Sequence, residues 1–341
     1  MKKLGGCITS NTFPVFTRFQ GRMKKTFSLI AKLLVSLLLV GILLHAADPA
    51  PVLDRMTQVN GPGILVVLSL VLFQITLVGW RWQLITRTCG TGLSFRDAQV
   101  LTFIGQFFNQ TLPSTIGGDV VRVVLATRAG MPVARATSSV LADRVVALLA
   151  LMLMAAATLP LFYTIILSHA MRTALTLLVA GGLCGFALCL LLGEWMARFI
   201  PFKKLSIFMA EFTRDMRCIM PTSRHGGLIM TLSILTHFMT VAVMFMMARM
   251  MSIPLGFLDA MVLIPPVILL TVLPISLAGW GIREGVMVFI LGKTGIVSAD
   301  ALALSLAFGL LISFAGLPGG VLWILRKGKA PHAGATNTVS P

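Results

Sequence analysis

The chain has 341 residues, of which 57% are hydrophobic and only 11% are Asp, Glu, Lys or Arg, and its 28 Lys and Arg against 11 Asp and Glu give a formal net charge of +17. Because a soluble domain carries about 25% charged residues, this composition excludes a soluble globular domain, a disordered chain and a disulfide scaffold. Nucleic acid is not an expected partner, since the basic residues stand between long apolar runs. The composition predicts an integral membrane protein whose positive charge marks one side of the bilayer.

The chain begins with a basic segment, residues 1–26, which we expect to lie in the cytoplasm. No apolar region precedes residue 27, which argues against a cleaved signal peptide. The first apolar run is therefore expected to act as an uncleaved anchor. Met23, followed by two lysines, would also make a good protein start, so the presence of residues 1–22 in the mature protein is left open.

The apolar runs that follow predict the fold class. A spanning helix needs about 20 mainly apolar residues. Six stretches meet this requirement: 27–46, 63–80, 145–167, 173–192, 228–250 and 300–325. Two further regions, 99–118 and 257–292, are apolar but interrupted by Pro, Gly, Asn and charged residues. We predict an all-α polytopic membrane protein with a single transmembrane domain, 27–326, that has six spans plus two broken, re-entrant hairpins, or alternatively eight hydrophobic segments.

The distribution of Lys and Arg predicts the orientation of the chain. Six lie in segment 1–26, six lie in the loop 193–227, and three lie around the start of the tail 327–341. The loops on the opposite side have only Arg55 and Arg172. Both termini and the loop 193–227 are thus expected in the cytoplasm, where this basic and amphipathic loop would lie on anionic lipid headgroups.

The same rule decides between the two topologies. Eight plain spans would place Arg122, Arg128 and Arg135 outside, so the re-entrant version fits the charges better. Arg81 is assigned here to the basic loop after the second apolar run. Trp82, at the end of that run, is assigned to the aromatic belt at the membrane surface.

The re-entrant topology contains an internal symmetry. Each half, about 27–167 and 173–326, has the order helix, helix, broken hairpin, helix, and the second half starts from the opposite side. Each broken segment has a Leu-Pro pair, ending at Pro113 and at Pro274, with a Gly five residues after the Pro and an Arg nine after it. This order is typical of inverted-repeat transporters, whose sites lie at broken helices near the bilayer midplane.

The first broken segment supplies the strongest candidate site. Gly117 and Gly118 would open a short helix whose N–H groups favour an anion, and a guanidinium such as that of Arg122 binds phosphate oxygens bidentately. The alternative is that Asp119 and Arg122 neutralise each other and hold the hairpin together. The candidate headgroup-binding residues of this segment are Asn109, Pro113, Gly117, Gly118, Asp119 and Arg122.

Two further groups of candidates follow. Asp143 and Arg144 are adjacent, so they point to different faces of a helix and either contribute to the site or pair with different neighbouring elements. The second broken segment has two glycines and an Arg-Glu pair, and its arginine is expected to face the headgroup from the other half. The candidates there are Gly279, Gly281, Arg283 and Glu284.

The sequence shows no nucleotide-binding loop, no Ser-His-Asp set and no paired carboxylates of a hydrolase. The five cysteines and five histidines have no metal-ligand spacing. We therefore expect no cofactor, no metal and no catalytic residue.

The run from Trp82 to Arg144 resembles the lysylphosphatidylglycerol synthase transmembrane-region family, also called flippase-like. The pattern is Asn-x-x-Leu-Pro, then Gly-Gly-Asp-x-x-Arg, then the pair Asp143-Arg144, and the resemblance covers about residues 27–326. It implies a bacterial inner-membrane protein that handles a phospholipid or an isoprenoid-linked lipid. The C-terminal aminoacyltransferase domain of the lipid synthases is absent from this short form, so aminoacyl transfer is not implied.

The function predicted is binding and flipping of such a lipid, with its headgroup held by arginines in the broken helices. The alternatives are a membrane-embedded enzyme of lipid or polyprenyl biosynthesis, which would use Asp119, Asp143 or Glu284 as acid-base groups, and an accessory subunit or scaffold for lipid-synthesis enzymes. The expected partners are membrane lipids and, in the last case, such an enzyme. Neither the lipid, nor the energy source, nor the oligomeric state follows from the sequence.

Overall fold

A computed structural model gives the fold for residues 41–42, 49–112, 116–219, 225–271 and 281–326. Almost all of the first predicted span, 27–46, and both terminal segments, 1–26 and 327–341, lie outside these described residues. Within them the regular structure is entirely α-helical. The prediction of an all-α polytopic protein is therefore confirmed.

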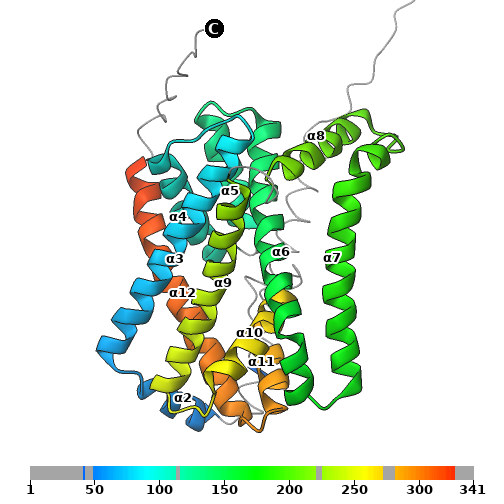
Figure 1. Ribbon diagram of the computed structural model, residues 1–341. Helices are drawn as coiled ribbons and strands as arrows, with labels where there is room; N and C mark the ends of the chain where they lie inside the picture. Colours follow the sequence, from blue (N-terminus) through cyan, green and yellow to red (C-terminus); the bar gives the residue numbers. More distant parts are fainter. Residues whose placement is uncertain (1–40, 43–48, 113–115, 220–224, 272–280, 327–341) are drawn as a thin grey trace, which may run out of the picture.

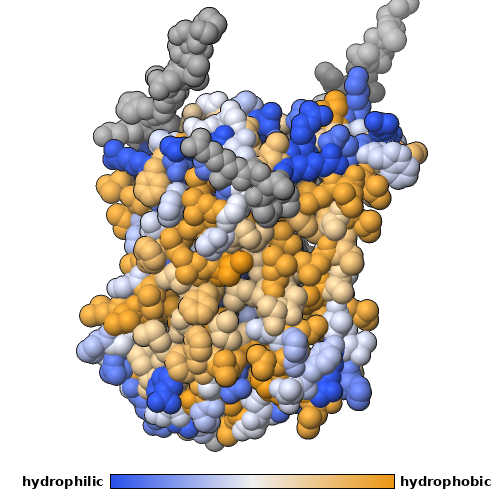
Figure 2. Space-filling model, viewed as in Figure 1, coloured by the Kyte–Doolittle hydropathy of each residue, from blue (hydrophilic) through white to orange (hydrophobic). Residues whose placement is uncertain are grey.

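Five of the described helices are long and apolar enough to cross a membrane. They are α3 (Gly61–Thr88), α6 (Val133–Ile165), α7 (His169–Ala197), α9 (Gly226–Met250) and α12 (Ser298–Arg326). Each contains or closely matches one of the apolar stretches predicted after the first. Figure 1 shows these helices running along one common direction, and Figure 2 shows a hydrophobic girdle between two hydrophilic ends.

Two shorter helices mark the ends of the bundle. Helix α2 (Pro49–Thr57) lies at one end and α8 (Lys203–Ile219) at the other, and we call these the α2 end and the α8 end. Each is tied to a long helix by an ion pair: Arg55 of α2 to Asp300 of α12 at 2.7 Å, and Asp215 of α8 to Arg135 of α6 at 2.9 Å. The predicted amphipathic loop thus contains a helix that packs across the bundle.

The two broken segments form two pairs of short helices. The first pair is α4 (Phe95–Thr111) and α5 (Gly117–Arg128), and the second is α10 (Phe257–Thr271) and α11 (Ile282–Gly292). Figure 1 shows the first pair in the half of the bundle nearer α8 and the second pair in the half nearer α2. Even the longest of them, with 17 residues, extends only about 25 Å, which is less than the roughly 30 Å hydrocarbon core.

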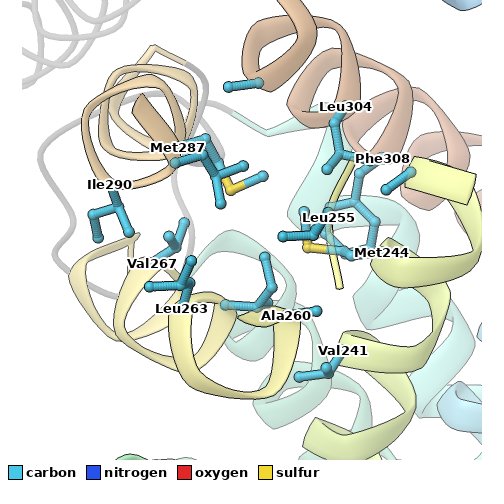
Figure 3. Packing of buried hydrophobic residues seen from close by; sticks show 14 of the residues in the cluster. Val241, Met244, Leu255, Ala260, Leu263, Val267, Met287, Ile290, Leu304 and Phe308 are labelled. Carbon is cyan, nitrogen blue, oxygen red and sulfur yellow. The ribbon is translucent and has the colours of Figure 1, made fainter. Parts of the chain in front are cut away.

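The core is built where these short pairs meet the long helices. Helix α4 packs on α12, α10 packs on α6, and α3 crosses α9. Figure 3 shows Leu263 of α10, Met287 of α11 and Phe308 of α12 around one shared apolar core. A Cβ on Gly319 of α12 would collide with the Phe103 carbonyl of α4, and one on Gly320 would crowd the Phe107 ring, so the Gly-Gly pair of α12 serves close packing.

The two ends differ in the number of basic residues. Those that the structure describes at or near the α8 end are Arg87, Arg96, Arg128, Arg135, Arg198, Lys203, Arg214, Arg217 and Arg326. Those at the α2 end are Arg55, Arg172, Arg249 and Lys293. Among the described residues, Lys and Arg are therefore more numerous at the α8 end than at the α2 end, and many of them lie in helices rather than in loops.

Candidate functional site

Three arginines and two aspartates, four of them buried, form an ionic cluster in the half of the bundle nearer α8. We call Arg81, Asp119, Arg122, Asp143 and Arg144 the first cluster. Asp143 of α6 lies at its centre and is only 2% exposed. Its Oδ1 accepts a hydrogen bond from Arg81 Nε at 2.7 Å, and its Oδ2 accepts from both terminal nitrogens of Arg122, each at 3.1 Å. Asp143 thereby links α3, α5 and α6.

Asp119, the third residue of α5, is the second acid of the cluster. Its Oδ2 accepts from Arg144 Nε at 2.6 Å, and its Oδ1 lies 3.5 Å from Arg122 Nη1. Asp143 and Arg144 therefore turn to different partners, as their adjacency on a helix predicts. The predicted Asp119–Arg122 pair exists, but Arg122 is held more closely by Asp143.

The positions of two members of this region correct the sequence analysis. Arg81 does not lie in a loop: it belongs to α3, is buried, and also donates to Ser233 Oγ of α9 at 3.2 Å. Trp82 does not lie in an aromatic belt, because it is fully buried beneath Arg122, whose guanidinium carbon is 4.1 Å from the ring centroid. Helix α3 continues past its apolar run, which carries both side chains into the protein interior.

The first cluster retains unused positive charge. Three guanidinium groups face two carboxylates, which leaves a formal excess of one positive charge. Arg122 Nε is buried and has no hydrogen-bond partner. The Arg144 side chain is 49% exposed, and within the described residues its terminal nitrogens have no ion-pair or hydrogen-bond partner. Buried charge without full compensation is costly, so this cluster is suited to an added anion.

Asn109 and Gly118 hold α4 and α5 together beside this cluster. The Gly118 N–H donates to Asn109 Oδ1 at 2.9 Å. A side chain at Gly118 would collide with the Gly105 carbonyl of α4, so glycine is required for this approach of the two helices. The Gly118 N–H therefore already has a partner in Asn109 Oδ1. The predicted anion-binding site loses this donor. Gly117 is buried at the start of α5, and Pro113 lies outside the described residues.

The second broken segment has a smaller cluster, which we call the second cluster: Arg283, Glu284 and Ser305. Glu284 is fully buried, and its Oε1 accepts from Arg283 Nη2 at 2.6 Å and from Ser305 Oγ at 3.1 Å. Its Oε2 accepts from the N–H of Gly281, whose φ of +89° only glycine adopts easily. One Arg and one Glu leave the second cluster neutral, and Glu284 closes the first turn of α11.

The two predicted arginines belong to separate ion pairs. Arg122 pairs with Asp119 and Asp143, whereas Arg283 pairs with Glu284 and lies 5.7 Å from the Phe308 ring centroid. Gly279, the remaining candidate, lies outside the described residues.

Comparison with known protein families gives a match that covers most of the chain. A family model described as the lysylphosphatidylglycerol synthase TM region matches residues 29–319. Both clusters and both broken segments fall within that range. The comparison with curated proteins gives no match.

Proposed function

Because the chain belongs to the lysylphosphatidylglycerol synthase TM region family, and is thus a multi-pass membrane protein linked to lipid metabolism, we propose that it binds and translocates a phospholipid or an isoprenoid-linked lipid. The observation that carries this proposal is the first cluster, an incompletely compensated set of arginines beside a broken helix. Charges within a membrane domain are costly, and they commonly mark substrate or ion pathways. A lipid phosphate would supply the missing negative charge.

The spacing of the helices along the chain favours an internal repeat, which supports the translocation part of the proposal. Helices α3 and α9 begin at Gly61 and Gly226, α5 and α11 at Gly117 and Ile282, and α6 and α12 at Val133 and Ser298, so the members of each pair begin 165 residues apart. Helices α4 and α10 begin 162 residues apart, at Phe95 and Phe257. One repeat unit thus accounts for the positions of four helix pairs.

The packing follows the same equivalence. The pairs are α3 with α9, α4 with α10, α5 with α11 and α6 with α12. Exchanging the members of each pair converts the α4–α12 contact into the α10–α6 contact, and the α4–α5 contact into the α10–α11 contact. The α2–α12 contact likewise corresponds to the α8–α6 contact. Since α4–α5 and α10–α11 lie in opposite halves of the bundle (Figure 1), we propose that the two units are inverted and that both hairpins are re-entrant.

This equivalence relates the two acids rather than the two arginines. Asp119 and Glu284 are each the third residue of their helix, whereas Arg122 is the sixth residue of α5 and Arg283 the second of α11. The Leu-Pro pattern in the sequence aligns Arg122 with Arg283 and is therefore four residues out of register with the helices. A headgroup clamped by two equivalent arginines is not supported, so the proposal places the headgroup at the first cluster alone.

We assign the α8 end to the cytoplasm of a bacterial inner membrane. The excess of Lys and Arg at the α8 end supports this orientation by the positive-inside rule. In it, α4–α5 opens toward the cytoplasm and α10–α11 toward the opposite side.

The test is translocation of a headgroup-labelled fluorescent lipid in proteoliposomes. The full chain is expected to move labelled phosphatidylglycerol between leaflets faster than protein-free vesicles do, and Arg122→Ala is expected to abolish the difference. Arg55→Ala, which removes an ion pair at the α2 end, serves as the control for a lost arginine. Normal translocation by a well-folded Arg122→Ala protein would defeat the proposal, and chemical conversion of the lipid would favour an enzyme instead.

A further inference from the structure

His237 is a histidine in the interior of a helix long enough to span the membrane. It is the twelfth residue of α9, which places it about 16 Å along the helix from Gly226 at 1.5 Å per residue. The other histidines that the structure describes, His169 and His225, lie where α7 and α9 begin. A histidine changes its charge between about pH 5 and pH 8, and an ionisable group inside a membrane domain commonly marks a proton or substrate pathway.

Contacts with two helices place His237 beside the first cluster. Helix α9 packs on both α3 and α6 (Figure 1). His237 Nε2 is 2.8 Å from the carbonyl oxygen of Ala147 in α6, and Ala147 lies four residues, about one turn, beyond Asp143 on the same helix face. Ser233, four residues before His237 on α9, accepts from Arg81 at 3.2 Å. His237 thus lies about one helical turn from the Arg81–Asp143 ion pair.

The hydrogen bond to α6 decides which ring nitrogen is able to take up a proton. A carbonyl oxygen only accepts, so Nε2 carries the hydrogen and Nδ1 keeps its lone pair. Within the described residues, no hydrogen bond joins Nδ1 to another group. A proton added to Nδ1 gives an imidazolium with one positive charge, and no bond breaks. The ring is therefore able to bind and release a proton while it stays bonded to Ala147.

A line of polar side chains continues along α9 from this position. Ser233, Thr236 and Thr240 are buried and share one helix face with His237. Gln74 of α3 donates to Thr240 Oγ1 at 2.8 Å. Hydroxyl groups both donate and accept, so these residues provide polar positions on both sides of the histidine between otherwise apolar helices.

The charges around His237 determine what a bound proton does. Arg81 of α3 and Asp143 of α6 are the nearest members of the first cluster, and Arg81 acts on His237 as a like charge. Helix α8 carries its charges at the end of the bundle. The remaining charged residues of α9 and of the helices packed on it lie within the first or last three residues of their helices: Arg87, Arg135, Arg249, Asp259, Asp300 and Arg326. Since the first cluster already has an excess of one positive charge, a protonated His237 raises the local excess to two.

We infer that His237 is a proton-binding site that couples lipid translocation to the movement of a proton. This inference rests on the proposed function and names its coupling ion. A lipid phosphate at the first cluster lowers the positive charge near the ring and so favours protonation. Protonation favours the phosphate in return, because coupling between two binding sites is reciprocal. The lipid and the proton are therefore expected to bind together.

The first test is the pH dependence of the binding of fluorescent phosphatidylglycerol to the purified full chain in detergent. A phosphodiester has no second acidic proton, so its charge stays constant over the range in which histidine titrates. The affinity of the wild type is expected to rise at least about fivefold as the pH falls from about 8 to about 5. An affinity that does not change with pH would overturn the inference.

Variants assign the effect to the residue. His237→Gln keeps a donor for the Ala147 carbonyl but has no group that titrates in this range. It is expected to bind the lipid as the wild type does at about pH 8 and to lose the increase at about pH 5. His225→Gln is the matched control, because His225 stands at the start of the same helix and makes no side-chain cap hydrogen bond, and it is expected to retain the increase. An increase retained by His237→Gln would overturn the assignment.

A measurement on the wild type covers the case in which His237→Gln does not fold. Addition of phosphatidylglycerol to the wild-type chain in weak buffer at about pH 6 is expected to take up protons, which a pH indicator dye records. No proton uptake on lipid binding would overturn the inference.

Proteoliposomes test the coupling to transport. A pH gradient across the membrane is expected to change the translocation rate of the wild type at least about fivefold and to leave the rate of His237→Gln unchanged. Translocation by the wild type that does not respond to the gradient would defeat only this inference. Lipid binding that depends on pH and on His237, without any translocation, would defeat the proposed function and leave the linked proton and lipid sites.

Discussion

The two broken segments each contain two short helices, but the ionic clusters beside them differ. Beside α4–α5, three arginines from α3, α5 and α6 meet two aspartates, donors remain unused, and one arginine is half exposed. In α10–α11, Arg283 and Glu284 neutralise each other, and Glu284 binds the backbone at the start of α11. In the proposed repeat, Asp119 and Glu284 are equivalent, yet their contacts differ: Asp119 accepts from the half-exposed Arg144, whereas Glu284 accepts from the N–H of Gly281 at the start of α11.

Removal of the central acid is expected to have the largest effect on this comparison. Asp143→Ala leaves Arg81 and Arg122 buried without their main partner, which costs about 3–5 kcal/mol of unfolding free energy. The measurement is unfolding in bicelles by steric trapping. Glu194→Ala, which removes the partner of the exposed Arg217, is the control and is expected to cost about 1 kcal/mol or less. An equal loss of unfolding free energy in both variants would show that Arg81 and Arg122 do not depend on Asp143 as their main partner.

The glycines at the two hairpins give the next contrast. Gly118→Ala is expected to cost about 1–3 kcal/mol, because its Cβ would collide with the Gly105 carbonyl. Gly285→Ala in α11 meets open space and is expected to stabilise the helix by up to about 1 kcal/mol. Both effects are read from the same unfolding measurement. A Gly118→Ala protein as stable as the wild type would contradict the close approach of α4 and α5.

Neutralising Glu284 separates structural from functional acids. Glu284→Gln is expected to cost about 1–3 kcal/mol through weakened bonds to Arg283 and Gly281. Its rate of lipid translocation is expected to remain close to that of the wild type, in contrast to Arg122→Ala. The proteoliposome assay on the two variants checks this, and loss of translocation in Glu284→Gln would place the second cluster in the binding site.

The aromatic partners of the two arginines are expected to show the smallest difference. Trp82→Leu removes a ring 4.1 Å from the Arg122 guanidinium, an interaction worth about 1–2 kcal/mol where water is excluded. Phe308→Leu removes a ring 5.7 Å from Arg283 and is expected to lose less in ion-ring attraction. Double-mutant cycles with Arg122→Gln and Arg283→Gln isolate these attractions from lost packing. A larger coupling for Phe308 would reverse the comparison.

The sequence predicts the parts of the fold that have a strong periodic signal. Long apolar runs predict the five described spans, and Pro, Gly and charge mark both broken segments. The divergence of Asp143 and Arg144 also follows from their adjacency. Arg81 and Trp82 are not predictable in this way, since their partners Asp143 and Ser139 are 62 and 57 residues away.

The register of the proposed repeat is a second feature that the short sequence motifs do not give. The Leu-Pro pairs and the arginines after them suggest that Arg122 and Arg283 are equivalent. The helices begin at different distances from those pairs, and a shift of four residues is about one helical turn. Equivalence within a repeat therefore depends on where each helix begins, which the short motifs do not determine.

The lipid that remains bound to the purified protein tests the central claim most directly. Mass spectrometry of lipids extracted with the detergent-solubilised full chain, compared with those of the source membrane, measures selection at the site. The account predicts enrichment of phospholipids or isoprenoid-linked lipids that carry a phosphate, and loss of that enrichment in Arg122→Ala but not in Arg55→Ala. A bound lipid composition equal to that of the bulk membrane, or one unchanged by Arg122→Ala, would contradict it.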